Sequence, residues 1–140
     1  SPEGPIYQAG TLSGNPISMS AGIAMLTQLK NNNVYETLNE ISDYMYSGLI
    51  DISKKYNYPL QVNKFCSMIG IFCSENIVHN YKDISDECVK NYTKLHRYML
   101  NNHIYFPPSA YEALFLSTKM NKENIDHVLE VFNNFCKESF

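Results

Sequence analysis

A glycine-punctuated loop that runs directly into a helix is the feature that most constrains the fold of this chain. The loop is Gly10-Thr11-Leu12-Ser13-Gly14, and Asn15-Pro16 follows it. Because Asn accepts hydrogen bonds from the first helical amides and proline suits the first helical position, a helix is predicted to begin at Pro16. Backbone amides, hydroxyls and the positive end of the helix dipole also suit an anion such as phosphate. Most such loops are merely turns, so the residues alone leave both interpretations open.

The helix that follows this loop is rich in small side chains. They are Ser18, Ser20, Ala21, Gly22 and Ala24. The apolar residues between them form no clean amphipathic stripe, and small side chains allow another element to approach closely. We therefore expect this helix to be buried.

The rest of the chain alternates helical and strand patterns. Apolar spacings of three and four predict helices at about 34–55, 85–101 and from Asn121 to near the end. The buried side of the helix at 85–101 is expected to carry Cys88, Tyr92, Leu95 and Met99. Short strands are predicted at about 60–65, 68–73, 104–106 and 113–117. With short connections, this order predicts an α+β fold in which helices pack on a small, mostly antiparallel sheet. We expect two parts, a loop with a linking helix at 1–33 and a small α+β domain at 34–140.

Composition narrows the range of partners. Charged residues make up 18% of the chain and the net charge is −3, with no basic stripe, which argues against nucleic acid. The apolar runs are far shorter than the roughly 20 residues that span a bilayer, so no membrane partner is expected. The 4 cysteines lie far apart without a C-x-x-C pair, which predicts no metal site and indicates reduced thiols in a cytoplasmic protein.

The loop and several later segments resemble one enzyme family. G-T-L-S-G-N-P before a small-residue helix resembles the motif of class III, fold-type-I pyridoxal-phosphate (PLP) enzymes. The preceding Tyr7-Gln8-Ala9 is similar to the glutamate-1-semialdehyde aminomutases in particular. Residues 67–72 (S-M-I-G-I-F) resemble their S-M-F-G-I-F strand, and residues 104–113 resemble their V-Y-L-A-P-S-x-F-E-A segment. The resemblance runs in one order along essentially the whole chain.

The resemblance implies the C-terminal small domain of a homodimeric PLP enzyme with its active site at the subunit interface. Such enzymes convert a small molecule, glutamate-1-semialdehyde, to 5-aminolevulinate, a tetrapyrrole precursor, in the cytoplasm or in plastids. Gly10 and Thr11 are then expected at the cofactor phosphate of the other subunit, with Tyr7 and Ser13 near the substrate. Glu112 is expected to be an active-site carboxylate that holds charge or moves a proton.

This chain also departs from the family. The resemblance implies a PLP-binding lysine and an acidic partner for the pyridine nitrogen ahead of the motif, yet every lysine here, from Lys30 onward, follows it. We therefore expect the chain alone to be inactive. Cys66 and Leu114 each stand where the family usually has glycine, and bulk at Leu114 puts the fit of the substrate near Glu112 in doubt.

Three interpretations stay open. The chain is a fragment of an aminomutase, a fragment of another class III aminotransferase, or a non-catalytic dimerisation or interaction module derived from this domain. A domain that normally packs on a larger one is expected to expose an apolar face when isolated.

Overall fold

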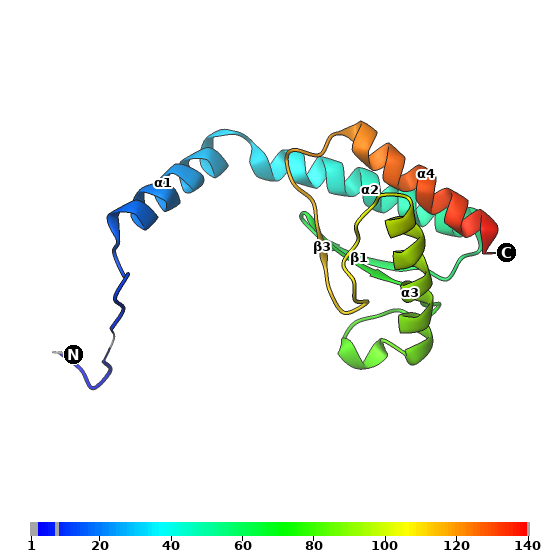
Figure 1. Ribbon diagram of the computed structural model, residues 1–140, viewed down its shortest axis with the longest axis horizontal. Helices are drawn as coiled ribbons and strands as arrows, with labels where there is room; N and C mark the ends of the chain where they lie inside the picture. Colours follow the sequence, from blue (N-terminus) through cyan, green and yellow to red (C-terminus); the bar gives the residue numbers. More distant parts are fainter. Residues whose placement is uncertain (1–2, 8, 140) are drawn as a thin grey trace. The chain divides into compact units, whose positions relative to one another are not determined.

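The computed structural model describes residues 3–7 and 9–139, and the chain divides into two units at the Val34–Tyr35 junction (Figure 1). Gln8, part of the motif quoted above, lies outside the described residues. The first unit contains the glycine-rich loop and helix α1 (Pro16–Asn31). The elements from the boundary onward are helices α2 (Val34–Tyr56), α3 (Asp86–Asn101) and α4 (Lys122–Glu138), strands β1 (Gln61–Phe65), β2 (Met68–Phe72) and β3 (Leu114–Phe115), and a short 3₁₀ helix, η1 (Tyr81–Asp83).

In the described residues the strands form one antiparallel sheet in the order β1-β2-β3. A two-residue turn joins β1 to β2, because Phe65 pairs with Met68. Ile69 and Ile71 point to the buried face, while Met68, Gly70 and Phe72 alternate with them on the other face, as the period of two in a strand predicts. Helices pack on the buried face, so the predicted α+β architecture is confirmed.

The helix α3 follows its sequence pattern closely. Ser85 caps its first turn by accepting a hydrogen bond from the Cys88 amide. Its buried residues are Cys88, Tyr92, Leu95 and Met99, the four predicted from their spacing. Each is at most 3% exposed, so this stripe forms one wall of the hydrophobic core.

The helices α2 and α4 run in the same direction. The Tyr44 hydroxyl donates to Asp126, and farther along both helices Lys55 Nζ donates to Asn133 Oδ1 at 3.3 Å. Between these contacts the helices approach closely, because a methyl group added at Gly48 would overlap the side chain of Leu129. Gly48 therefore allows this helix pair to pack.

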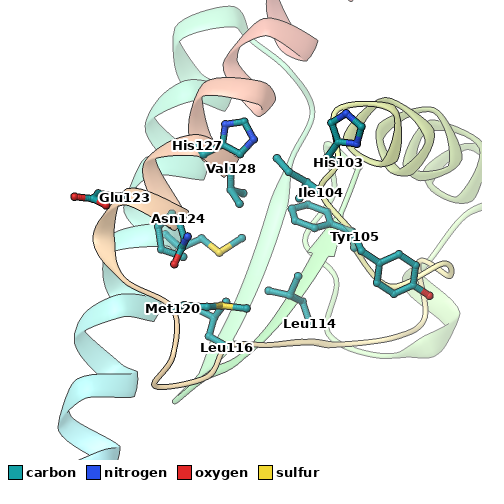
Figure 2. Close-up of a pocket in the computed structure, with 13 residues that line it drawn as sticks. His103, Ile104, Tyr105, Leu114, Leu116, Met120, Glu123, Asn124, His127 and Val128 are labelled. Carbon is teal, nitrogen blue, oxygen red and sulfur yellow. The ribbon is translucent and has the colours of Figure 1, made fainter.

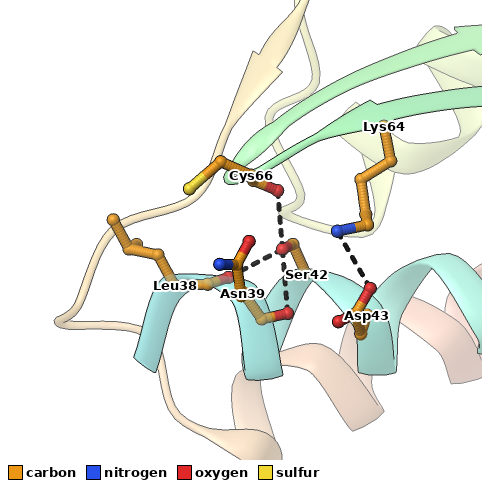
Figure 3. Close-up of polar contacts among 6 residues, drawn as sticks. All are labelled: Leu38, Asn39, Ser42, Asp43, Lys64 and Cys66. Carbon is orange, nitrogen blue, oxygen red and sulfur yellow. Dashed lines mark hydrogen bonds and ion pairs between the residues drawn. The ribbon is translucent and has the colours of Figure 1, made fainter. Parts of the chain in front are cut away.

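A buried serine fastens the β1–β2 turn to α2 (Figure 3). The Ser42 hydroxyl, fully buried, lies 2.7 Å from the Cys66 carbonyl oxygen and 2.7 Å from that of Leu38. Next to it, Lys64 Nζ lies 2.9 Å from Asp43 Oδ1. Cys66 has a φ of +51°, a left-handed conformation that glycine adopts without cost. This explains why glycine suits the position.

One strand prediction was wrong and a second was too long, and both differences follow from hydrogen bonding. Residues 104–106 form no strand, because the Ile104 amide closes the end of α3 by donating to the Met99 carbonyl at 2.9 Å. His103 adopts a φ of +64° to allow this closure. The strand expected at 113–117 is only Leu114–Phe115, since the Leu116 amide already meets the Ser67 carbonyl in the hairpin turn at 3.0 Å.

The expectation that α1 is buried was also wrong for this chain. Among the described residues of α1, none is buried, and apolar side chains such as Ile17 and Leu26 are exposed. The physical reason is that its unit contains a loop and a single helix, so the unit offers no second layer. A helix with apolar residues on all sides is typical of a buried environment.

The sheet carries an exposed apolar row on the face opposite the core. Phe65 pairs with Met68, and Met68 pairs with Phe115, so the three side chains lie side by side across the strands. They are 77%, 40% and 65% exposed, respectively. This is the exposed face expected of a domain that packs on a larger one. Within the described part of the chain, no helix has the length and apolar character needed to cross a bilayer.

Candidate functional site

The glycine-rich loop folds into a tight turn that ends at the α1 cap. The Ser13 amide donates to the Gly10 carbonyl at 3.1 Å, and the Asn15 amide donates to the Leu12 carbonyl at 3.1 Å. A Cβ at position 10 would overlap Ser13 Oγ, so a larger residue there would need the exposed Ser13 hydroxyl to rotate away. Gly14 takes a φ of +74°, which favours glycine.

The first amides of α1 are occupied by its cap. Asn15 Oδ1 accepts from Ile17 N at 3.1 Å and from Ser18 N at 3.2 Å. The predicted helix start at Pro16 is therefore confirmed, but these amides are not the free donors that an anion at the helix end would use. Any anion held here would meet the loop ahead of the cap.

The polar side chains of the loop face solvent. Thr11 and Ser13 are exposed, and within the described residues no hydrogen bond engages the Thr11 hydroxyl. Tyr7 is 80% exposed. The basic residue of the first unit, Lys30, lies at the opposite end of α1. The loop therefore offers hydroxyl donors for an anion but no cationic side chain.

Glu112 lies in the second unit, at the end of a turn that leads into β3. Its amide donates to the Ser109 carbonyl at 3.1 Å, and Ala110 beside it is buried. The carboxylate is exposed, and in the part of the chain that the structure describes no hydrogen bond or ion pair engages it. It is thus available to a ligand from outside the chain.

Sequence reasoning missed the aromatic residues around this turn. The Tyr92 hydroxyl, from α3, donates to the Pro107 carbonyl at 2.8 Å. Tyr81 from η1 stacks on Tyr111, with ring centroids 4.9 Å apart. Tyr92 was predicted only as a core residue, and spacing alone carries no signal for its hydroxyl.

The side chain of Leu114 packs toward the hydrophobic core and not on the solvent-exposed face of the sheet. Leu114 pairs with Ile69 and is half-buried. The extra bulk relative to glycine is therefore accommodated inside the domain.

The segment before η1 is held by Asp83. Its Oδ2 accepts hydrogen bonds from the His79 amide at 2.9 Å and from the Asn80 amide at 3.0 Å. These two bonds, in that order of importance, hold the pKa of the Asp83 carboxyl below its usual value. The carboxylate thus stabilises the segment that carries Tyr81.

A separate apolar cavity of about 570 Å³ contains none of the predicted site residues. It lies between α4 and the segment at 103–106, and Figure 2 shows His103 and His127 at one end of it. Its lining includes Ile104 and Val128. Its lining also includes His103, Glu123 and His127, and among the described residues no hydrogen bond or ion pair joins these three side chains.

Cys73, Cys88 and Cys136 are buried, whereas Cys66 is half-buried in the β1–β2 turn. Cys73 and Cys136 are at most 2% exposed, and burial raises the pKa of each thiol to about 12. All 4 cysteines are free thiols in the structure. Neutral, buried thiols are poor nucleophiles, so we assign Cys73 and Cys136 no catalytic role.

Comparison with known proteins identifies the family. The model of the class-III aminotransferase family matches residues 2–134, so the chain belongs to that family. It is 41% identical over 133 residues to glutamate-1-semialdehyde 2,1-aminomutase 1 of Macrococcus caseolyticus, covering 95% of this chain and 31% of the relative. It is 42% identical over 138 residues to the aminomutase of Clostridium botulinum strain Eklund 17B, covering 97% and 32%. The chain thus spans about a third of the length of these relatives.

Solved structures show the same fold. An omega-transaminase from Sphaerobacter thermophilus matches with a TM-score of 0.82 at 19% identity, over 94% of this chain and 30% of that one. A glutamate-1-semialdehyde aminomutase from Pseudomonas aeruginosa matches with a TM-score of 0.77 at 15% identity, over 99% and 31%.

Proposed function

We propose that this chain is the C-terminal part of a PLP-dependent aminomutase that converts glutamate-1-semialdehyde to 5-aminolevulinate. The identity of 41% and 42% to two such enzymes, along 95% and 97% of the chain, carries this proposal. We further propose that the complete protein is a cytoplasmic homodimer with its active site at the subunit interface. The exposure of the loop and of Glu112 supports the active site at a subunit interface, because both are available to groups from another subunit.

The loop residues fit one edge of a phosphate site. Gly10 leaves the space that Ser13 Oγ fills, and this turn presents Thr11 to solvent. When bound, PLP supplies the electron sink for moving an amino group. Because no cationic side chain lies in this loop, the main phosphate charge must be balanced elsewhere. This supports a secondary contact, made to the cofactor of the other subunit.

In this proposal Thr11 binds the cofactor phosphate and helps to orient the cofactor. Its hydroxyl donates a hydrogen bond to a phosphate oxygen, while Ser13 and Tyr7 lie on the same exposed loop, near the substrate. A hydrogen bond to a charged group contributes about 1.5–3 kcal/mol. We therefore expect Thr11→Ala in the complete protein to weaken PLP binding by this amount, and Thr27→Ala, an exposed threonine of α1, to leave it unchanged. Equal PLP affinity of both variants in a titration would remove Thr11 from the site.

Glu112 acts at the substrate. A carboxylate beside an amine stabilises its charged form and accepts or returns its proton. The side chain suits this role because its own backbone is fixed by the bond to Ser109 while its carboxylate has no intramolecular partner among the described residues.

Substitution of Glu112 tests the proposed function. In the complete protein we expect Glu112→Gln to lower turnover by about a hundredfold or more, as loss of an acid–base group does, with little change in unfolding free energy. Glu130→Gln, an exposed change on α4, is the matched control. Wild-type turnover of the Glu112→Gln protein would exclude the carboxylate from the reaction.

A further inference from the structure

The turn that presents Glu112 has few backbone hydrogen bonds of its own. It begins with Pro107 and Pro108, which carry no amide hydrogen. Inside it, the Tyr111 amide donates to Ser109 Oγ at 3.2 Å, and the Glu112 amide donates to the Ser109 carbonyl at 3.1 Å. These local bonds shape the end of the turn, and the stacking of Tyr111 on Tyr81 links that end to η1.

A side-chain hydrogen bond anchors the beginning of the turn to α3. Tyr92 on α3 is 3% exposed, and its hydroxyl donates to the Pro107 carbonyl at 2.8 Å. Burial raises the pKa of Tyr92, and the nearby Cys73 and Glu112 add to the effect. The hydroxyl therefore stays protonated and remains a donor at any physiological pH.

We propose that Tyr92 is a positioning residue for Glu112, fixing through its hydroxyl the turn that holds the carboxylate toward the substrate. This inference rests on the function proposed above for Glu112. Tyr92 itself does not touch the substrate, since its ring is enclosed in the core and its hydroxyl is bonded to the turn.

The same helix supplies a matched control. Tyr98, two turns further along α3, donates its hydroxyl to Glu138 Oε1 at 2.9 Å, at the end of α4. Tyr92→Phe and Tyr98→Phe each remove one hydroxyl from a half-buried or buried ring of α3 while keeping the ring. Only the first removes a bond to the Glu112 turn.

The experiment is a double-mutant cycle on turnover in the complete protein. We expect Tyr92→Phe to lower kcat about tenfold with little change in KM, since small displacements of a catalytic group are costly. Tyr98→Phe is expected to keep wild-type kcat. In the Glu112→Gln background, Tyr92→Phe is expected to have almost no further effect, because the group it positions is already lost. Equal kcat for the two tyrosine variants, or full additivity with Glu112→Gln, would overturn the inference.

Hydrogen exchange separates this inference from the proposed function. Tyr92→Phe is expected to accelerate amide exchange in residues 109–113 of the complete protein severalfold, whereas Tyr98→Phe is not. Faster exchange together with unchanged turnover of Glu112→Gln would refute the function of the carboxylate but support the anchoring of the turn. Unchanged exchange in Tyr92→Phe would refute the anchoring itself.

Discussion

Ser42→Ala tests how the β1–β2 turn is held to the helical layer. The fully buried Ser42 hydroxyl meets the Cys66 carbonyl at 2.7 Å, so its removal leaves that carbonyl without this donor. An unsatisfied buried polar group costs about 1–3 kcal/mol. Alanine returns about 0.5 kcal/mol through its higher helix propensity. The net expectation is a loss of about 0.5–2.5 kcal/mol in the free energy of unfolding.

Ser47→Ala provides the internal control, because Ser47 is exposed on the same helix. It carries the gain in helix propensity without the lost bond, so we expect it to stabilise the domain by about 0.5 kcal/mol. The chain has no tryptophan, so urea unfolding is best followed by far-UV circular dichroism. Equal midpoints for the two variants would refute the argument that the Ser42 bond secures the turn.

Three further changes probe other parts of the second unit. Cys66→Gly is expected to stabilise it by about 1 kcal/mol in urea unfolding by relieving a φ of +51°, whereas Cys66→Ala is not. In Gly48→Ala the new methyl group overlaps Leu129, so we expect an overpacking cost of about 1–3 kcal/mol to exceed the gain in helix propensity of about 1 kcal/mol. In a Leu129→Ala background the same change should cost less. Strict additivity of the two changes in unfolding free energy would contradict this packing. Because folding lowers the pKa of Asp83, its carboxylate stabilises the folded state above the unfolded pKa of about 3.9, and this stability is lost as the pH falls through the folded pKa. Asp83→Asn should therefore lose less stability than wild type between about pH 5 and about pH 2. An unchanged pH profile relative to wild type would count against this role.

Much of the second unit follows from local pattern. The buried stripe of α3 and the β1–β2 hairpin were predicted because apolar spacing reports directly which face is covered. The missing strand at 104–106 was not predictable in this way. Its extended, alternating pattern is real, but the Ile104 amide is used by the end of α3, and His103 carries none of the sequence signal that glycine gives at such a position.

In the candidate site, too, features set by local sequence were predictable and features set by the tertiary fold were not. Gly10 was predicted to lie in a glycine-punctuated loop at the cofactor phosphate; the structure gives the loop as a turn, in which the Ser13 amide donates to the Gly10 carbonyl, while its place at a phosphate stays a prediction. The occupied amides at the start of α1 were foreseeable from Asn15, since a good cap competes with an anion for the same donors. The link from Tyr92 to Pro107 joins residues 15 positions apart and depends on the tertiary fold, so no local pattern reveals it. The burial expected of α1 was not found, because it would need a second layer that its own unit does not contain.

The most direct test of the central claim is an assay of the complete protein with glutamate-1-semialdehyde and PLP, without any keto acid or other amino acceptor. An aminomutase moves the amino group within one molecule, so the account predicts 5-aminolevulinate over many turnovers under these conditions. A product that forms only when an amino acceptor is added would identify another class III aminotransferase instead. No conversion under either condition by the folded, PLP-loaded protein would contradict the proposed activity.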